Sequence, residues 1–170
     1  EASSLAGHFG LNNLVVIWDD NRITIEGETE LAFNEDVGKR YEAYGWFVQR
    51  IDGHDHGQIR KAIDAALAQT DKPSFIVART HIANGAPNAH DTAEAHGAPL
   101  GKDEIAATKK GMGWDAEKHF YVPDEVYALF KERAEDNLKD KAKWQSDVDA
   151  WKKASGELAP NAAEEATLAA

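Results

Sequence analysis

The sequence contains no cysteine and has far fewer basic than acidic side chains. Without cysteine there is no disulfide framework, no thiolate nucleophile and no cysteine-bound metal. Nineteen Lys and Arg against 30 Asp and Glu give a net charge of -11. Nonspecific nucleic-acid binding needs clustered Lys and Arg, which such an acidic chain does not favour. No apolar run approaches the roughly 20 residues that span a bilayer, and no signal peptide opens the sequence. We therefore expect no nucleic-acid or membrane partner, and a cytoplasmic location.

The rest of the composition is that of an ordinary globular chain. Hydrophobic residues make up 42% and charged residues 29% of the 170 positions, enough for one domain with a sizeable core. On so acidic a chain, a bound phosphate must be held by backbone dipoles, a metal ion or a few local cations. The sequence opens on Glu1-Ala-Ser-Ser-Leu without an initiator Met and reads there as a helix interior, so we expect a fragment or a cleavage product.

Three short apolar runs are predicted to form strands, at residues 14–18, 46–51 and 74–78. The first and third are almost continuously apolar, as expected where both faces of a sheet are covered. Helical spacing of apolar residues lies between the runs, at 36–44 and 58–69. This alternation predicts an α/β fold, with a parallel sheet and flanking helices joined by right-handed crossovers.

The second part of the chain has a different character. Residues 81–100 carry turn residues without periodicity and are predicted to form a long loop, which in a compact domain is usually functional or disordered. A short helix is predicted at 102–111. Pro123 opens a long helix to about Ala154, and the tail after Gly156 reads as a linker or weak helix.

Local signals refine the helices. Asp55 is a candidate N-cap and Gly45 a candidate C-cap for the two helices between the strands. The apolar residues of the long helix are candidate buried positions: Val126, Leu129, Phe130, Leu138, Trp144, Val148 and Trp151.

The segment Asp19-Asp20-Asn21 carries the first chemical signal, because it directly follows the first predicted strand. Ligands of parallel sheets sit beyond the carboxyl ends of the strands, and carboxylate and amide oxygens suit Mg²⁺ or Ca²⁺. Such an ion would bridge a diphosphate to an acidic protein. Asp and Asn are also common in turns, so the residues alone leave a plain turn and a metal site both open.

Several separated motifs, in order along nearly the whole chain, resemble transketolase. They are Glu-Ala-Ser-Ser-Leu-Ala-Gly-His at 1–8, Asp-Asp-Asn-Arg-Ile-Thr-Ile at 19–25, Lys-Arg-Tyr-Glu-Ala-Tyr-Gly-Trp at 39–46, Asp-Gly-His-Asp at 52–55, His-Gly-Ala-Pro-Leu at 96–100 and Val-Pro-Asp-Glu-Val-Tyr at 122–127. The resemblance implies the latter half of a thiamine-diphosphate-binding domain at 1–122. Residues 123–170 would form a long helix and linker toward the next domain.

The resemblance also implies an activity. Transketolases transfer a two-carbon ketol group between sugar phosphates, using thiamine diphosphate and Mg²⁺ or Ca²⁺, and act as homodimers. The family's Gly-Asp-Gly motif and its pyrimidine-binding domain are absent from this sequence. We therefore expect the remaining parts of a transketolase chain as partners, and an inactive chain when it is alone.

Four residues receive roles through this resemblance. Asn21 matches the residue whose side-chain oxygen binds the divalent ion, and Ile23 the residue whose backbone carbonyl is a second ligand. Ile25 matches an apolar residue beside the cofactor's thiazolium ring. His96 matches the histidine of the His-Gly-Ala-Pro motif, placed near the reactive carbon and the sugar hydroxyls, where it handles protons. Without the motif, His96 would more simply be a loop histidine bonded to a backbone carbonyl.

The other histidines receive structural interpretations. His54 and His56 flank a predicted helix start, where capping or surface roles are expected. Four residues of the long loop could imitate a metal cluster: His90, Asp91, Glu94 and His96. A mobile acidic loop explains them equally well.

Three other functions remain open on the sequence. A related thiamine-diphosphate enzyme, of the dihydroxyacetone synthase or deoxyxylulose-phosphate synthase type, shares much of the pattern. A non-catalytic subunit that acts only with a partner chain would explain the missing cofactor motif. A generic phosphate-binding α/β module would need several separate motifs to coincide by chance.

Overall fold

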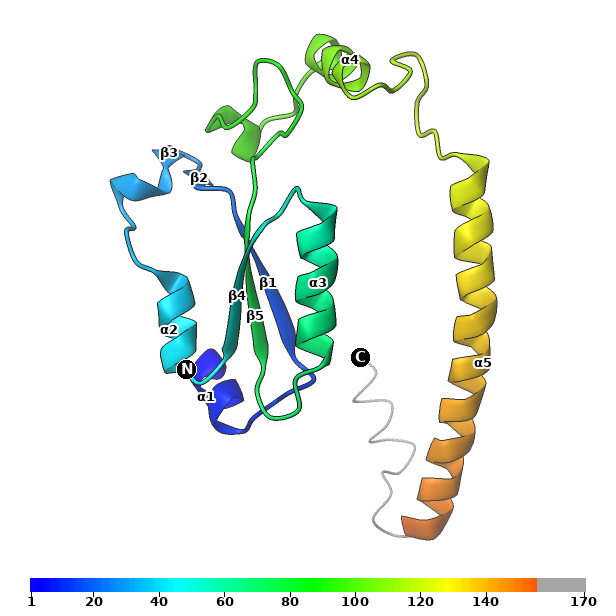
Figure 1. The fold of residues 1–170 in the computed structure, drawn as a ribbon. Helices are drawn as coiled ribbons and strands as arrows, with labels where there is room; N and C mark the ends of the chain where they lie inside the picture. Colours follow the sequence, from blue (N-terminus) through cyan, green and yellow to red (C-terminus); the bar gives the residue numbers. More distant parts are fainter. Residues whose placement is uncertain (156–170) are drawn as a thin grey trace. The chain divides into compact units, whose positions relative to one another are not determined.

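The computed structural model describes residues 1–155 (Figure 1). The chain divides into two compact units after Glu117. The first unit carries the sheet, and the second carries a long helix. Within the described residues, no helix has the length and apolar character needed to cross a membrane.

A parallel sheet of three strands forms the centre of the first unit. The strands are β1 (Val15–Asp20), β4 (Phe47–Asp52) and β5 (Ser74–Arg79), and their spatial order is β1-β5-β4. β5, the most apolar of the three, lies in the middle, and its first five residues are buried. The predicted parallel sheet and flanking helices are therefore confirmed, with strand bounds that differ from the prediction by at most two residues.

Helices cover both faces of this sheet. On one face, Trp46, Phe75 and Val77 pack with residues of α1 (Ala2–His8) and α2 (Val37–Ala43). On the other face, α3 (His56–Leu67) packs Ala62 and Ala66 on Ile76. The stacking of Tyr41 on Phe75, with ring centroids 3.8 Å apart, joins α2 to the central strand.

The helix ends follow local chemistry. The Asp55 carboxylate accepts hydrogen bonds from the backbone N–H groups of Gly57 (2.8 Å) and Gln58 (3.1 Å), which confirms the predicted N-cap of α3. After α2, Gly45 has a φ of 87°, a left-handed conformation that glycine adopts without steric cost.

The end of the first strand differs from the prediction. β1 continues through Asp19 and Asp20, because the parallel ladder with β5 extends as far as the pair Asp20 and Arg79. Successive side chains of a strand point to opposite faces. The two carboxylates therefore cannot converge on one ion, and Asn21 alone follows the strand directly.

Smaller elements lie beyond the sheet's carboxyl end. A hairpin of β2 (Ile23–Thr24) and β3 (Gly27–Glu28) leads into the 3₁₀ helix η1 (Thr29–Leu31). The predicted long loop contains only the short 3₁₀ helix η2 (Glu94–His96), and α4 (Lys102–Gly111) has the predicted bounds.

The second unit contains α5, which spans Asp124–Ser155 and confirms the predicted long helix. The expected buried positions on it are wrong for the described residues. None of its residues is buried, and Leu129, Phe130 and Trp144 are exposed. The physical reason is that the described part of this unit holds no second element against which α5 could pack. The predicted linker after Gly156 lies outside the described residues.

Candidate active site at the carboxyl end of the sheet

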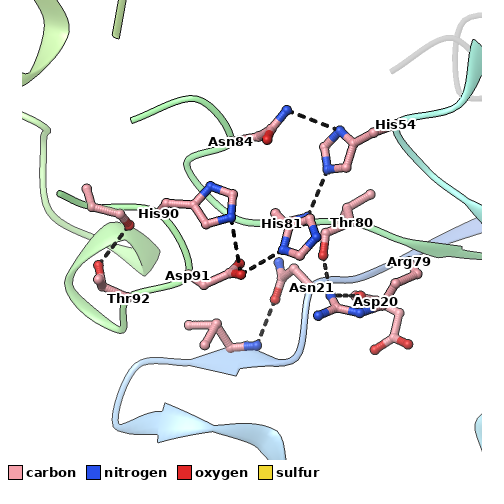
Figure 2. Close-up of polar contacts among 12 residues, drawn as sticks. Asp20, Asn21, His54, Arg79, Thr80, His81, Asn84, His90, Asp91 and Thr92 are labelled. Atoms are coloured by element: carbon pink, nitrogen blue, oxygen red, sulfur yellow. Dashed lines mark hydrogen bonds and ion pairs between the residues drawn. The ribbon is translucent and has the colours of Figure 1, made fainter. Parts of the chain in front are cut away.

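Polar side chains gather where the three parallel strands end. Asn21 follows β1, His54 follows β4, and Thr80 and His81 follow β5 (Figure 2). Parallel strands bring their carboxyl ends to one edge of the sheet, which is where α/β proteins bind ligands. These residues are separated by up to about 60 positions in the sequence, and the parallel strands bring them to one edge of the sheet.

Asn21 is held in a tight local turn. Its side-chain oxygen accepts a hydrogen bond from the backbone N–H of Ile23 at 2.9 Å, and Arg22 between them has a left-handed φ of 62°. An amide oxygen has two lone pairs. One is used in the turn, so the second is available for a ligand such as a cation.

A small cavity of about 180 Å³ lies against this turn. Three of its lining residues are acidic and two are arginines; the lining is Asn21, Arg22, Ile23, Glu28, Glu30, Arg79 and Asp91. Amide, carbonyl and carboxylate oxygens are the donors that Mg²⁺ and Ca²⁺ prefer. The donor set therefore fits a divalent cation, whereas an unaccompanied diphosphate would meet net negative charge.

Ile25 occupies the tip of the β2–β3 hairpin. Thr24 and Gly27 pair across the turn, and the Thr24 hydroxyl donates to the Gly27 carbonyl at 2.9 Å. The Ile25 side chain is 69% exposed. An apolar side chain on a hairpin tip exposes its surface to water, which is unfavourable. Covering an apolar ligand would remove that surface from water.

The two aspartates of β1 stabilise the edge of the sheet. The Thr80 hydroxyl donates to the Asp19 carboxylate, and the Asp20 carbonyl accepts from the Arg79 guanidinium at 3.0 Å. These bonds join β1 to the end of β5. Asp19 and Asp20 therefore fix the end of β1, from which the turn at Asn21 begins.

A second polar group centres on His81 (Figure 2). Its Nδ1 lies 2.6 Å from Oδ2 of Asp91, and Nε2 of His90 lies 3.3 Å from the same oxygen. The backbone N–H of His81 donates to Nε2 of His54 at 2.9 Å. The hydrogen bond from His81 holds the pKa of Asp91 below its ordinary value, so this carboxylate is ionised at neutral pH.

His96 ends the 3₁₀ helix η2, and its side chain is exposed. Its backbone N–H donates to the Ala93 carbonyl at 3.0 Å. Within residues 1–155, its imidazole has no hydrogen-bond partner. The backbone-bonded loop histidine considered as the simpler alternative is therefore not what the structure shows.

The predicted residues are only partly brought together. Asn21 and Ile23 line one cavity, whereas in the described chain Ile25 and His96 lie outside its lining. Of the four residues suggested as an imitation metal cluster, His90 and Asp91 meet each other, and their third neighbour is His81 rather than Glu94 or His96.

Sequence reasoning missed His81 and assigned His54 a capping or surface role. A signal for both was present, because each follows the end of a predicted strand just as Asn21 does. His54 is exposed, but its ring accepts the His81 N–H and thereby ties the ends of β4 and β5 together.

Comparisons with known proteins agree with this architecture. Residues 1–168 match the family model described as transketolase, thiamine diphosphate binding domain. The transketolase of Geobacillus stearothermophilus is 43% identical over 161 residues, covering 94% of this chain and 24% of that protein. Transketolase 1 of Aliivibrio fischeri is 47% identical, with 94% and 24% covered.

Solved structures give the same result. A transketolase from Campylobacter jejuni matches with a TM-score of 0.82 and 40% identity, covering 87% of this chain and 23% of that chain. A Pichia stipitis transketolase in complex with sedoheptulose-7-phosphate matches with a TM-score of 0.83 and 43% identity, covering 92% and 23%. This chain thus spans about a quarter of the length of the relatives that it matches. It belongs to the transketolase thiamine diphosphate binding domain family.

Proposed function

We propose that this chain forms part of a transketolase that transfers a two-carbon ketol group from a ketose phosphate to an aldose phosphate. The observation that carries the proposal is the position of Asn21 and Ile23, which line one acidic cavity at the carboxyl end of β1. Family membership supplies the reaction class. A relative was solved with a ketose phosphate, sedoheptulose-7-phosphate, which supports sugar phosphates as substrates.

In this proposal Asn21 and Ile23 hold Mg²⁺ or Ca²⁺, which anchors the diphosphate of thiamine diphosphate. The Asn21 side-chain oxygen and the Ile23 carbonyl are hard donors, and their tight turn fixes them relative to each other. When bound, thiamine diphosphate supplies the carbon nucleophile and the electron sink that C–C bond cleavage requires. The chain's own part is to bind and orient this group.

Two further residues are proposed to serve the chemistry. Ile25 offers an apolar surface for the cofactor ring and excludes water there. His96 has an imidazole without an internal partner in the described residues, and a neutral imidazole both donates and accepts hydrogen bonds. We assign it the movement of protons to and from sugar hydroxyls.

The site needs more than this chain. Ile17 on β1 is 56% exposed, and Leu14, just before the strand, is also exposed, so apolar side chains of this edge segment are open to solvent in the described unit. We propose that the remaining parts of a transketolase chain cover this edge and supply the missing cofactor contacts. The assembled enzyme is proposed to be a cytoplasmic homodimer, and the chain alone to be inactive.

The test is a ketol-transfer assay on a protein in which this chain is joined to the rest of a transketolase. With thiamine diphosphate and Mg²⁺, the joined protein should convert a ketose phosphate and an aldose phosphate, and the separate chain should not. Transfer with an unrelated donor and acceptor would identify another thiamine-diphosphate enzyme type. Absence of any transfer by a folded, cofactor-saturated protein would contradict the proposal.

A further inference from the structure

We propose that His81, His90 and Asp91 form a binding site for a zinc-type transition-metal ion. Of these three residues only Asp91 also lines the cavity at Asn21, and the two imidazoles give the proposed site a different donor set. One ligand atom from each residue lies within 4.8 Å of the other two. The Asp91 carboxylate sits between the two imidazoles, with Oδ2 2.6 Å from His81 Nδ1 and 3.3 Å from His90 Nε2 (Figure 2).

These distances suit a metal after a small adjustment. Zinc binds imidazole nitrogen and carboxylate oxygen at about 2.0–2.2 Å, so neighbouring ligand atoms of a tetrahedral site lie about 3.3 Å apart. The contact between His90 and Asp91 already has this spacing. The contact between His81 and Asp91 must open, which replaces one hydrogen bond by two metal bonds. The fourth position would be taken by water or by an exogenous ligand.

The backbone holds two of the ligands in place. The Asp91 N–H donates to the Ile82 carbonyl at 3.1 Å, so the residues beside His81 and His90 are joined directly across the loop. The Thr92 hydroxyl donates to the Ala89 carbonyl at 2.9 Å, which closes the turn that carries His90 and Asp91. Asp91 has a left-handed φ of 54°, an uncommon conformation for a residue with a side chain.

A second layer of groups orients His81. The His54 ring accepts the His81 N–H, and the two rings stack at 5.6 Å with an interplanar angle of 15°. Asn84 in turn contacts the other ring nitrogen of His54 at 3.3 Å. These contacts fix the backbone of His81 and one face of its ring.

One oxygen of the cluster lacks a partner. In the part of the chain that the structure describes, the Oδ1 atom of Asp91 is buried and accepts no hydrogen bond. Buried carboxylate oxygens are normally satisfied. An ion bound by both oxygens of the Asp91 carboxylate would satisfy Oδ1 as well as Oδ2. The two imidazole nitrogens favour a zinc-type ion over Mg²⁺, which prefers oxygen ligands.

The competing explanation is a structural ion pair, in which the histidines only hold the loop. Titration calorimetry with ZnCl₂ distinguishes the two. Metal-stripped protein without thiamine diphosphate should bind one Zn²⁺ per chain at its tightest site. His90→Ala should weaken this binding by at least about tenfold, and His54→Ala by less. His56→Ala, which removes an exposed histidine outside the cluster, should bind as wild type does.

Asn21→Ala should also leave Zn²⁺ binding unchanged, so failure of the zinc site and failure of the proposed cofactor site can be told apart. A Co²⁺ titration gives an independent readout, because four-coordinate Co²⁺ absorbs visible light, and this band should be lost in His90→Ala. Circular dichroism checks that the variants fold, and His90→Gln serves if His90→Ala does not. Absence of Zn²⁺ binding, or equal binding by wild type and the folded His90 variant, would overturn the proposal.

Discussion

Two neighbouring strands with similar apolar sequences have very different environments. Ile17 of β1 and Ile76 of β5 are partners in the parallel ladder, and they point to the same face of the sheet. Ile76 is 1% exposed, whereas Ile17 is 56% exposed. β5 has a strand on each side and Ala62 and Ala66 of α3 above Ile76. In the described residues β1 pairs only with β5.

The difference in burial suggests that the two strands have different roles. The central strand β5 contributes most to stability, because burial of apolar area is the main favourable term in folding. The edge strand β1 contributes less, but it ends directly at Asn21 and the acidic cavity. An open apolar edge is also a place for further chain to pack.

The loop that follows β5 is expected to serve the chemistry, and the turn that follows β1 to serve binding. In the joined protein, His96→Ala should lower turnover by about 10²–10⁴-fold, the range for loss of a proton-transfer group. The affinity for thiamine diphosphate should stay nearly the same. Steady-state kinetics and cofactor titration measure the two quantities. Near-normal turnover would leave His96 with a structural role only.

Substitution of the ladder partners tests the comparison of the strands directly. Ile76→Ala should reduce the free energy of unfolding by about 2–5 kcal/mol, because it leaves a cavity between the sheet and α3. Ile17→Ala in the same chain should cost less than about 1 kcal/mol. Urea unfolding measures both. Equal losses would mean that Ile17 is covered as well as Ile76 is. A larger loss for Ile17→Ala in the joined protein than in the separate chain would show that further chain covers β1 there.

The hairpin after β1 should respond to ligand. Residues 22–33 include an exposed hairpin tip at Ile25 and no buried residue, so we expect limited proteolysis there without cofactor. Thiamine diphosphate with Mg²⁺ should slow cleavage in the joined protein several-fold. The cleavage rate in α5, measured in the same digest, is the control. The same rate with and without ligand in the hairpin would argue against a cofactor contact.

The smallest expected effect is a change in the pH dependence of stability, through Asp55 in the segment between β4 and α3. Hydrogen bonds from Gln58 and then Gly57 lower the pKa of Asp55, the N-cap of α3. A carboxyl whose pKa is lowered by folding stabilises the protein at pH values above its pKa in the unfolded chain, about 3.9. This contribution is lost as the pH falls through the lower pKa of the folded state.

Asp55→Asn keeps a capping side chain but removes the titration. Its melting temperature should therefore fall less than that of wild type between about pH 5 and about pH 3. Thermal unfolding at several pH values measures the difference, and parallel curves for the two proteins would contradict this role of Asp55.

Much of the fold follows from local signals in the sequence. The apolar run at β5 and the Asp55 cap of α3 act over a few residues, and both are confirmed. The C-cap of α2 is Tyr44 rather than the predicted Gly45, which follows it in a left-handed conformation. The extension of β1 through Asp20 could not be predicted, because ladder pairing with Arg79 outweighs the turn preference of two aspartates.

The candidate site was predictable only in part. Asn21 and Ile23 are neighbours in sequence, so motif and strand end together indicated them. The cluster of His54, His81 and Asp91 depends on contacts across 27 positions, from His81 to His54, and across 10 positions, from His81 to Asp91. Such contacts are fixed by the strand order and by the path of the loop, which residue spacing alone does not reveal.

We propose that the end of β1 anchors thiamine diphosphate through a divalent cation. The most direct test is titration of the cofactor onto the joined protein with Mg²⁺ and after removal of divalent metal by EDTA, for wild type and Asn21→Ala. We predict that wild type loses affinity when the metal is removed. Asn21→Ala should bind weakly in both conditions and show little further dependence on metal. Unchanged, metal-dependent affinity in Asn21→Ala would contradict the assignment.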